Sequence, residues 1–222
     1  PGSSTRPALQ GPLSREVLSS VTDADLDSLR FFGLAECRLA GAKGWVTRTG
    51  YTGDLGYELW VANDDAVGLY DALLEAGEPH NMQPMGLDAL DVSRIEAGFV
   101  LQGVDYISSR SCLIESRKST PEEAGLGWTV NLDREGWIGR DALLREREVG
   151  PKWGLVGLEF DWAELEGLHA EYDLPPHLAP IACRSAVPVY LSSGEQVGQV
   201  TSSTWSPTLK RYLGLGQVFA EH

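Results

Sequence analysis

A carboxylate lies inside a strand-like segment of the sequence, in the stretch "RTGYTGDLGYELWV" at residues 48–61. Side chains alternate between the faces of an extended strand, so Glu58 shares its face with Trp60. The apolar neighbours Tyr57 and Leu59 point to the opposite face. An acid beside a tryptophan lies either on a solvated strand edge or in an aromatic-lined pocket. In a pocket, its two oxygens could accept adjacent N–H donors of a flat ring, which is how a pterin or guanine edge would be held.

The glycines of the same stretch, Gly50, Gly53 and Gly56, have two interpretations. They do not form a phosphate loop, because the stretch lacks both the Lys-Ser/Thr ending of a P-loop and the strand-to-helix context of a dinucleotide fingerprint. They either supply positive φ angles in a tight connection or let the backbone pass close to a flat ligand.

A helix-like segment, "ALDVSRIEAG" at residues 89–98, carries further charged groups. Asp91 and Arg94 have a three-residue spacing that is usually a surface ion pair. Ser93 has no partnered histidine, and the histidines of the chain fall in loops or polar stretches. A Ser/His or Cys/His nucleophile is therefore not supported.

The cysteines, Cys37, Cys112 and Cys183, are widely spaced and follow no metal-ligand pattern. This usage indicates buried free thiols in a reducing intracellular compartment and no structural zinc site.

The composition is that of a soluble globular protein. Of the 222 residues, 42% are hydrophobic and 23% are charged, which allows one large or two modest domains. No window approaches the roughly 18 to 20 apolar residues of a membrane-spanning helix. The net charge of -14 argues against a nucleic-acid surface, because phosphate binding needs clustered Lys and Arg. The opening "PGSSTRP" is neither an initiator methionine nor a signal peptide, so we expect a piece of a longer polypeptide.

Helices and strands are expected to alternate up to about residue 148. "WVTRT" and "YELWV" predict a hairpin whose connection is the glycine-rich stretch. Before it, an extended entry leads to a helix with Pro12 at its first position and a second short helix capped by Asp23. Leu13, Val17 and Leu18 are expected to share one face of the first helix, and Leu26 and Leu29 are expected to face inward from the second.

Two helices are predicted after the hairpin. The first opens at residues 63–65 and closes at Gly77, and the second is bounded by the glycines of residues 86–98. The apolar stripe of the first is predicted to be Val67, Tyr70, Leu73 and Leu74. A strand at residues 127–132 and a helix from about Gly139 follow.

The composition shifts at about residue 150, after which the chain is mostly strand. The predicted strands are "WGLVGLEF", "AVPVYL", "QVGQVTSS" and "YLGLGQVF", with one short helix at residues 162–171. We therefore predict an α+β protein with domains at residues 1–149 and 150–222, the second small and β-rich. Residues 201–204 are expected to end a strand and Ser206 to start a turn, a structural role that leaves open whether they line a cleft.

Six motifs follow one another in the order and spacing of a known family. They are "ALQGP" at 8–12, "RTGYTGDLGYEL" at 48–59, "GLDALDVSRIEAG" at 86–98, "TPEEAGLGWTV" at 120–130, "IGRDAL" at 138–143 and "VGQVTSSTWSPTLKRYLGLGQV" at 197–218. The sequence thus resembles the aminomethyltransferase family, which comprises the T-protein of the glycine cleavage system and its folate-dependent demethylase relatives. The resemblance implies the middle and C-terminal parts of a three-domain cloverleaf, ending in a small β-rich barrel domain.

The resemblance also assigns residues to a folate site. The glutamate that grips the pterin ring in the family is matched by Glu58. Tyr51 and Trp128 match aromatic residues along the folate, and Arg94 matches the later arginine of the family's helix, so all three are assigned to cofactor binding. Asp91 matches the aspartate of that helix and is a candidate catalytic residue. The family's principal catalytic aspartate belongs to the part that precedes this chain.

One position departs from the family's glycine-cleavage members, which have an arginine where this chain has Leu90. Leucine cannot replace the bidentate donor of a guanidinium, so the folate tail or substrate must be held differently. This helix is similar to that of the sarcosine and dimethylglycine dehydrogenase group.

The implied activity is tetrahydrofolate-dependent transfer of a one-carbon group from a small methylated amine or related donor. Two alternatives stay open: the folate-handling portion of a flavin-linked dimethylglycine or sarcosine demethylase, and a non-catalytic folate-binding regulatory or repair protein. The implied partners are the small-molecule donor and a lipoyl carrier protein or a fused or partner oxidase. Neither nucleic acid, membrane nor metal is expected, and the implied location is cytoplasmic.

Overall fold

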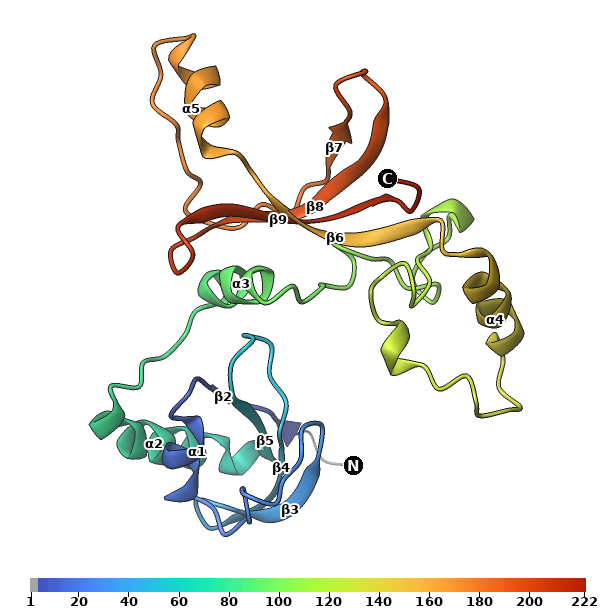
Figure 1. Cartoon of the computed structure of the whole chain (residues 1–222). Helices are drawn as coiled ribbons and strands as arrows, with labels where there is room; N and C mark the ends of the chain where they lie inside the picture. The colour runs from blue at the N-terminus through green and yellow to red at the C-terminus, as the bar shows by residue number, and fades with distance from the viewer. Residues whose placement is uncertain (1–3) are drawn as a thin grey trace. The chain divides into compact units, whose positions relative to one another are not determined.

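The structure is a computed structural model that describes residues 4–222. The chain divides into two compact units, Pro1–Ala97 and Gly98–His222, each with its own sheet and helices (Figure 1). This mixed content of helix and strand confirms the predicted α+β class.

An antiparallel sheet organises the first unit. Its strands are β1 (Ser4–Thr5), β2 (Ala8–Gln10), β3 (Leu34–Leu39), β4 (Ala42–Thr47) and β5 (Gly56–Ala62). They are ordered β1-β5-β4-β3, and β2 also pairs with β5. The predicted hairpin is confirmed as β4 and β5, in a register that places Trp45 opposite Trp60 and Thr47 opposite Glu58. β3 was not predicted.

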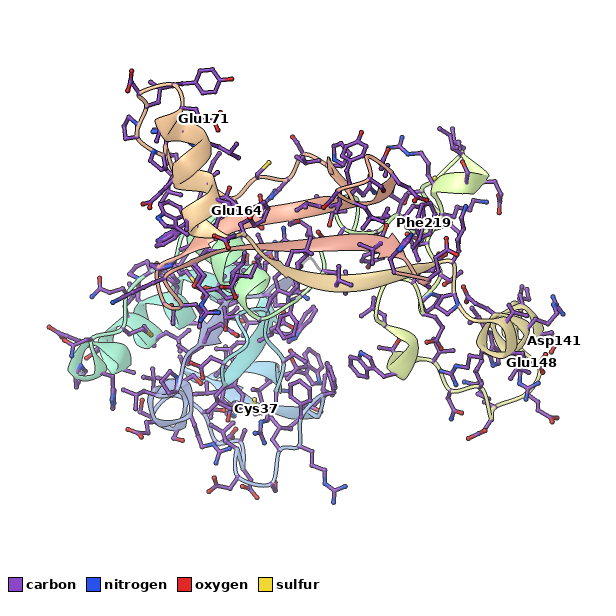
Figure 2. The ribbon with its side chains drawn as sticks, turned by 45° about the horizontal axis from the view of Figure 1, so that its top comes forward. Cys37, Asp141, Glu148, Glu164, Glu171 and Phe219 are labelled. Carbon is purple, nitrogen blue, oxygen red and sulfur yellow. The ribbon has the colours of Figure 1, made fainter. Side chains whose placement is uncertain are left out.

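Helices α1 (Ser14–Ser19) and α2 (Ala66–Gly77) pack on one face of this sheet (Figure 1). The core between them includes fully buried leucines from every layer, namely Leu18, Leu39, Leu59 and Leu69. Burial of each such side chain stabilises the fold by about 1.5–3 kcal/mol. Cys37 lies in the same core (Figure 2).

The predicted stripe of α2 was partly wrong. Val67 and Tyr70 are exposed, whereas Leu69, Leu73 and Gly77 are buried. The buried residues follow a strict four-residue spacing, and the 3-10 turn η1 (Asn63–Asp65) sets the phase with which the helix meets the sheet. The predicted end at Gly77 is confirmed.

Two predictions for the N-terminal segment were wrong. α1 begins at Ser14, after a turn in which Gly11 has a φ of 114° and its carbonyl accepts the Ser14 N–H, so Pro12 lies outside the helix. Asp23 begins no helix, because its Oδ1 accepts the backbone N–H of Arg38 at 2.6 Å and so joins the turn to β3. Residues 26 and 29 are nevertheless buried leucines, as predicted.

The first unit ends with two more elements, η2 (Glu78–His80) and α3 (Leu87–Glu96). α3 confirms the helix predicted between two glycines: Gly86 is its N-cap, and Gly98, which follows its C-terminus, has a φ of 75°.

The second unit contains a four-stranded antiparallel sheet in the order β6-β9-β8-β7. Its strands are β6 (Trp153–Glu159), β7 (Val187–Tyr190), β8 (Gln196–Ser206) and β9 (Arg211–Phe219), which confirms the predicted strand segments. Helices α4 (Arg140–Val149) and α5 (Trp162–Ala170) also lie where they were predicted (Figure 2).

Two local predictions in this unit were wrong. Residues 127–132 contain the 3-10 turn η4 (Gly127–Thr129) instead of a strand, and both the backbone N–H and the hydroxyl of Thr129 donate to Leu126 O. A further 3-10 turn, η3 (Glu115–Arg117), precedes it. Residues 201–204 lie inside β8, not at its end. The predicted turn after Ser206 is present, and its hydroxyl accepts the Leu209 N–H at 2.8 Å.

In the sequence, the boundary between the two compact units falls between residues 97 and 98. The division into folate-binding and barrel regions at residue 149/150 stays a prediction.

Candidate functional site

Glu58 lies in the middle of β5, on the face of the sheet opposite α1 and α2. The buried residues Tyr57 and Leu59 flank it, while the Glu58 side chain itself is 25% exposed. The predicted alternation along the strand is therefore confirmed. Part of the carboxylate remains reachable from outside the sheet.

Two side chains hold the Glu58 carboxylate from opposite oxygens. Thr49 Oγ1 donates to Oε2 at 2.7 Å, and Arg6 Nε lies 3.6 Å from Oε1. Arg6 is half exposed and also places its guanidinium carbon 4.8 Å from the centre of the Trp60 ring. Each carboxylate oxygen has two lone pairs, so Glu58 keeps capacity to accept further N–H donors.

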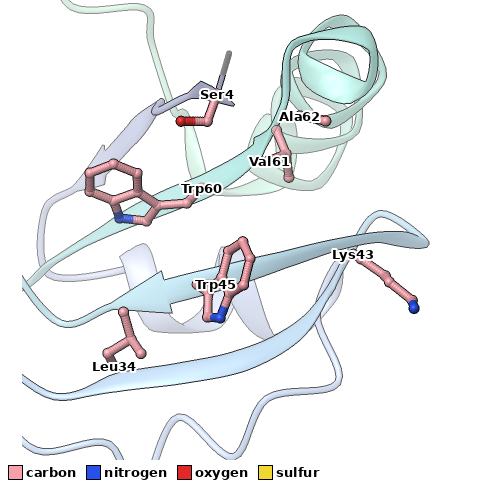
Figure 3. Close-up of a pocket in the computed structure, with 7 residues that line it drawn as sticks. All are labelled: Ser4, Leu34, Lys43, Trp45, Trp60, Val61 and Ala62. Atoms are coloured by element: carbon pink, nitrogen blue, oxygen red, sulfur yellow. The ribbon is translucent and has the colours of Figure 1, made fainter. Parts of the chain in front are cut away.

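The tryptophan beside Glu58 has its own unmet hydrogen-bonding requirement. Trp60 Nε1 is buried and has no hydrogen-bond partner within residues 4–222. Trp60 and its cross-strand neighbour Trp45 line a cavity of about 560 Å³ together with Leu34, Lys43 and Val61 (Figure 3). Both alternatives for Glu58 are thus partly realised: it is on a partly solvated face, and that face continues into an aromatic cavity.

The glycine-rich connection is shaped around Gln10 of β2. A Cβ at Gly50 would lie 2.1 Å from Gln10 Oε1, and a Cβ at Gly56 would lie 2.3 Å from it. Gln10 in turn accepts the Thr52 hydroxyl at 3.0 Å. Gly53 has a φ of 79°, so this glycine serves the tight-turn interpretation, whereas the other two serve close packing with a side chain.

Asp91 and Arg94 form a buried ion pair, contrary to the usual surface interpretation. Arg94 Nε donates to Asp91 Oδ1 at 2.7 Å, and the residues are 0% and 6% exposed, respectively. Spacing alone could not separate the two cases, because a three-residue separation aligns side chains on a surface and in a core equally well. Leu90, the position that departs from the family pattern, is half-buried in the same helix.

The aromatic candidates are positioned by different units. Tyr51 is half-buried in the β4–β5 connection, two residues after the Thr49 that binds Glu58. Trp128 lies in η4 of the second unit, and its side chain is exposed. The structure therefore brings Tyr51 and Glu58 into one hairpin and pairs Asp91 with Arg94.

Sequence reasoning missed Thr49, Arg6, Trp45 and Gln10 as companions of Glu58. The signal for Thr49 and Trp45 was the hairpin itself, because a predicted register places the residues of one strand opposite those of the next. Arg6 and Gln10 reach the site from chain segments about fifty residues earlier, and no local pattern indicates such a pairing.

The three cysteines differ in their burial. Cys37, Cys112 and Cys183 are free, and only Cys37 is buried, so the predicted burial holds for one of the three. Burial raises the pKa of the Cys37 thiol, which keeps it in the unreactive protonated form. Across residues 4–222, no cluster of His, Cys, Asp or Glu is arranged to hold a metal ion, and no helix is long and apolar enough to span a membrane.

Two family profiles match the chain. The GCVT N-terminal domain matches residues 4–134, and the glycine cleavage T-protein C-terminal barrel domain matches residues 169–222. The first covers more than half of the sequence.

Similar proteins match nearly all of the chain, which corresponds to about half of their own length. The aminomethyltransferase of Halothermothrix orenii is 40% identical over 211 residues, which are 95% of this chain and 52% of that protein. The aminomethyltransferase of Caldanaerobacter subterraneus is 35% identical over 97% of this chain and 50% of its own length.

The fold is similar to that of a solved relative. The glycine cleavage system aminomethyltransferase T from Bartonella henselae superimposes with a TM-score of 0.75 at 26% identity, covering 98% of this chain and 52% of the other. The chain spans about half the length of the relatives it matches. On the matched profiles and these relatives, the chain belongs to the glycine cleavage T-protein (aminomethyltransferase) family.

Proposed function

We propose that the chain is the folate-handling part of a tetrahydrofolate-dependent one-carbon transferase, which takes a methyl or methylene group from a small methylated amine or related donor. The observation that carries the proposal is the state of Glu58: a partly exposed carboxylate held by Thr49 and Arg6 next to an aromatic cavity. Membership of the family makes folate the expected ligand of this site.

The residues present fit the edge of a pterin. Such an edge offers adjacent N–H donors, and Glu58 retains acceptor capacity beyond its bond to Thr49. A pterin also carries acceptor atoms, for which the buried Trp60 Nε1 is a donor without a partner among the described residues. Arg6, being half exposed and 3.6 Å from Glu58, can move aside without the loss of a short hydrogen bond.

The chain's own residues would bind and orient the folate. Glu58 fixes the pterin edge, and Tyr51 and Trp128 are proposed as aromatic contacts along the rest of the molecule. Bound tetrahydrofolate supplies N5 as the acceptor of the one-carbon group. Holding two reactants in line lowers the entropic part of the barrier, so positioning is the main contribution we assign to this part of the protein.

Asp91 and Arg94 are proposed as positioning residues of the site. Their mutual ion pair is buried within α3, which supports a role in fixing that helix. A buried pair holds its partners in one geometry and is disrupted at high cost when either charge is removed. Direct contact of Arg94 with folate and proton transfer by Asp91 remain the alternative roles.

We also propose that the chain forms the middle and C-terminal parts of the three-domain cloverleaf, in the cytoplasm. A lipoyl carrier protein is the proposed partner of a glycine-cleavage activity. Leu90 favours the second candidate, the folate-handling portion of a flavin-linked demethylase, because it removes a guanidinium that glycine-cleavage members carry. A fused or partner oxidase would then replace the lipoyl carrier.

Calorimetric titration of the full-length protein with tetrahydrofolate tests the proposal. Glu58→Gln should weaken binding by roughly 1.5–3 kcal/mol, the value of a charged hydrogen bond. Glu36→Gln is the matched control, because Glu36 is an exposed glutamate on β3 opposite Trp45, on the same sheet face. Equal affinity of the Glu58 variant and the wild type would refute the assignment.

Mass spectrometry then separates the candidate activities. Incubation with methylated amines and tetrahydrofolate should yield 5-methyl-tetrahydrofolate if a methyl group is transferred directly. 5,10-Methylene-tetrahydrofolate is two electrons more oxidised and forms only from an amine that an oxidase has first oxidised. Product that appears only when an oxidase is added would favour the demethylase candidate, and binding without product would favour the regulatory one.

A further inference from the structure

A second cavity, of about 400 Å³, lies within the unit Gly98–His222. Its walls are the loop of residues 103–107, the segment 116–119 and Arg184, and its floor is formed by residues of β6, β8 and β9. This volume is in the range of sites for small molecules. None of its residues takes part in the proposed site at Glu58.

The loop wall of the cavity is fixed to the sheet through Asp105. The hydroxyls of Thr201 and Ser202 both donate to Asp105 Oδ1 at 2.6 Å, and the Leu101 N–H donates to Oδ2 at 2.8 Å. Asp105 is 1% exposed. The second wall is joined to the first by a backbone hydrogen bond of 3.1 Å from the Ser119 N–H to Ile107 O. The cavity is therefore built by specific contacts.

The floor of the cavity presents an unused donor. Gln199 and Gln217 are cross-strand neighbours on β8 and β9, and both line the cavity. Gln217 Nε2 is buried without a hydrogen-bond partner among the described residues. An amide nitrogen can only donate, so the missing partner is an acceptor such as an oxygen. Leaving such a group unsatisfied is costly, which favours a ligand that supplies the acceptor.

The charged groups around this donor are mainly basic. Arg117, Lys118 and Arg184 line the cavity in a chain whose net charge is -14. The acid among the lining residues is Asp105, which already accepts three hydrogen bonds. Lys118 is paired with Glu115, whose side chain is almost fully exposed, and a surface pair of this kind contributes little. The field in the cavity therefore favours a negative ligand.

We propose that this cavity binds a small organic anion. One carboxylate or phosphate oxygen accepts a hydrogen bond from Gln217 Nε2, and Arg117 and Lys118 neutralise the charge. Tyr106 and Trp153, which also line the cavity, contact the apolar part of the ligand. The aromatic walls favour an organic acid over a bare inorganic ion.

Titration of the full chain with glutarate and, separately, with inorganic phosphate tests the proposal. The side-chain amide signals of Gln217, identified by their loss in Gln217→Met, should shift on addition of glutarate. Arg117→Gln combined with Lys118→Gln should weaken binding about tenfold or more, the value of a charge-assisted hydrogen bond. Arg30→Gln, a change of an exposed arginine of the other unit, should leave it unchanged.

Three results would overturn the proposal. The first is that neither probe binds saturably up to about 10 mM, because an affinity weaker than this is too low for a specific site. The second is a glutarate affinity that does not change in the Arg117 and Lys118 variant. The third is that the Gln217 signals do not move. Binding of phosphate with no response to glutarate would overturn the organic part of the assignment. Because Arg117 is exposed, its variant tests the site even if Gln217→Met does not fold.

Discussion

The hydroxyl of Thr49 donates a 2.7 Å hydrogen bond to Oε2 of Glu58, joining the start of the β4–β5 connection to the strand that leaves it. This bond fixes one carboxylate oxygen and leaves the other facing Arg6. The orientation of Glu58 therefore depends on a residue of the connection as well as on its own strand.

Replacement of Thr49 by valine should weaken tetrahydrofolate binding to the full-length protein by about threefold to tenfold, corresponding to roughly 1 kcal/mol for one lost hydrogen bond. The side chain keeps its shape, but the Glu58 carboxylate is no longer held in one rotamer. Calorimetric titration of the wild type and of Thr49→Val with tetrahydrofolate measures the difference in affinity.

Thr5→Val is the control for this prediction, because the hydroxyl of Thr5 bonds Asn63 and not Glu58. If both threonine variants bound tetrahydrofolate equally well, Thr49 would have no part in orienting the acid.

The packing of Gln10 against the glycines predicts a coupling between them. Gly50→Ala should destabilise the fold by about 1–2 kcal/mol, because its methyl group would displace the Gln10 amide from its bond with Thr52. In a Gln10→Ala background the same change should cost much less. Urea denaturation of the four proteins of this double-mutant cycle measures the coupling.

Gly68→Ala is a matched control in the same unit. Gly68 is exposed in α2, nothing lies within 4 Å of its added Cβ, and its φ is not positive. Alanine should stabilise this helix by about 0.5–1 kcal/mol. Equal losses at Gly50 and Gly68 would contradict the role given to Gln10.

The buried pair of α3 predicts a large loss on removal of either charge. Arg94→Met should destabilise the protein by about 3–5 kcal/mol, because it removes the positive charge that binds Asp91 at 2.7 Å in a buried position. Chemical denaturation measures the loss, and Asp91→Leu combined with Arg94→Met should recover part of it. A loss below about 1 kcal/mol would be the value of a surface pair.

The buried thiol predicts a pH dependence. Burial raises the pKa of Cys37, so the folded state favours the protonated thiol; this stability is present below the unfolded pKa and is lost as the pH rises towards the folded pKa. Stability measured from neutral to alkaline pH should therefore fall more steeply for the wild type than for Cys37→Ala.

Alkylation provides an independent measurement. Iodoacetamide should modify Cys112 and Cys183 before Cys37 in the native protein, as read by peptide mass spectrometry, and all three at similar rates in denaturant. Rapid native labelling of Cys37 would show that its core position opens readily.

The sequence predicted those features that depend on local periodicity. The β4–β5 hairpin followed from β-branched and aromatic residues on either side of a glycine-rich connection, and α3 followed from its bounding glycines. β3 was missed because its exposed face carries Glu36 and Arg38, which obscure the strand pattern. The burial of Asp91 with Arg94 depends on tertiary packing, which the spacing of two charges does not encode.

The candidate site was predictable to a similar degree. Glu58 could be selected because an acid inside an aromatic strand is unusual and because six motifs were in register. Its surroundings were not predictable, since Arg6 and Gln10 reach it across long sequence separations. Such contacts are decided by sheet topology, which short patterns do not specify.

The contacts of Asp105 with its hydroxyl partners affect the order in which the chain folds during synthesis. The bonded residues are 96 and 97 positions apart, and β8, which supplies the hydroxyls, is one of the last strands of the chain. During synthesis the first unit can close its core before these partners leave the ribosome. The loop around Asp105 must then lack its two bonds to the sheet until the β8–β9 hairpin is complete, so a stall in translation before that hairpin leaves this part of the molecule more exposed to proteases.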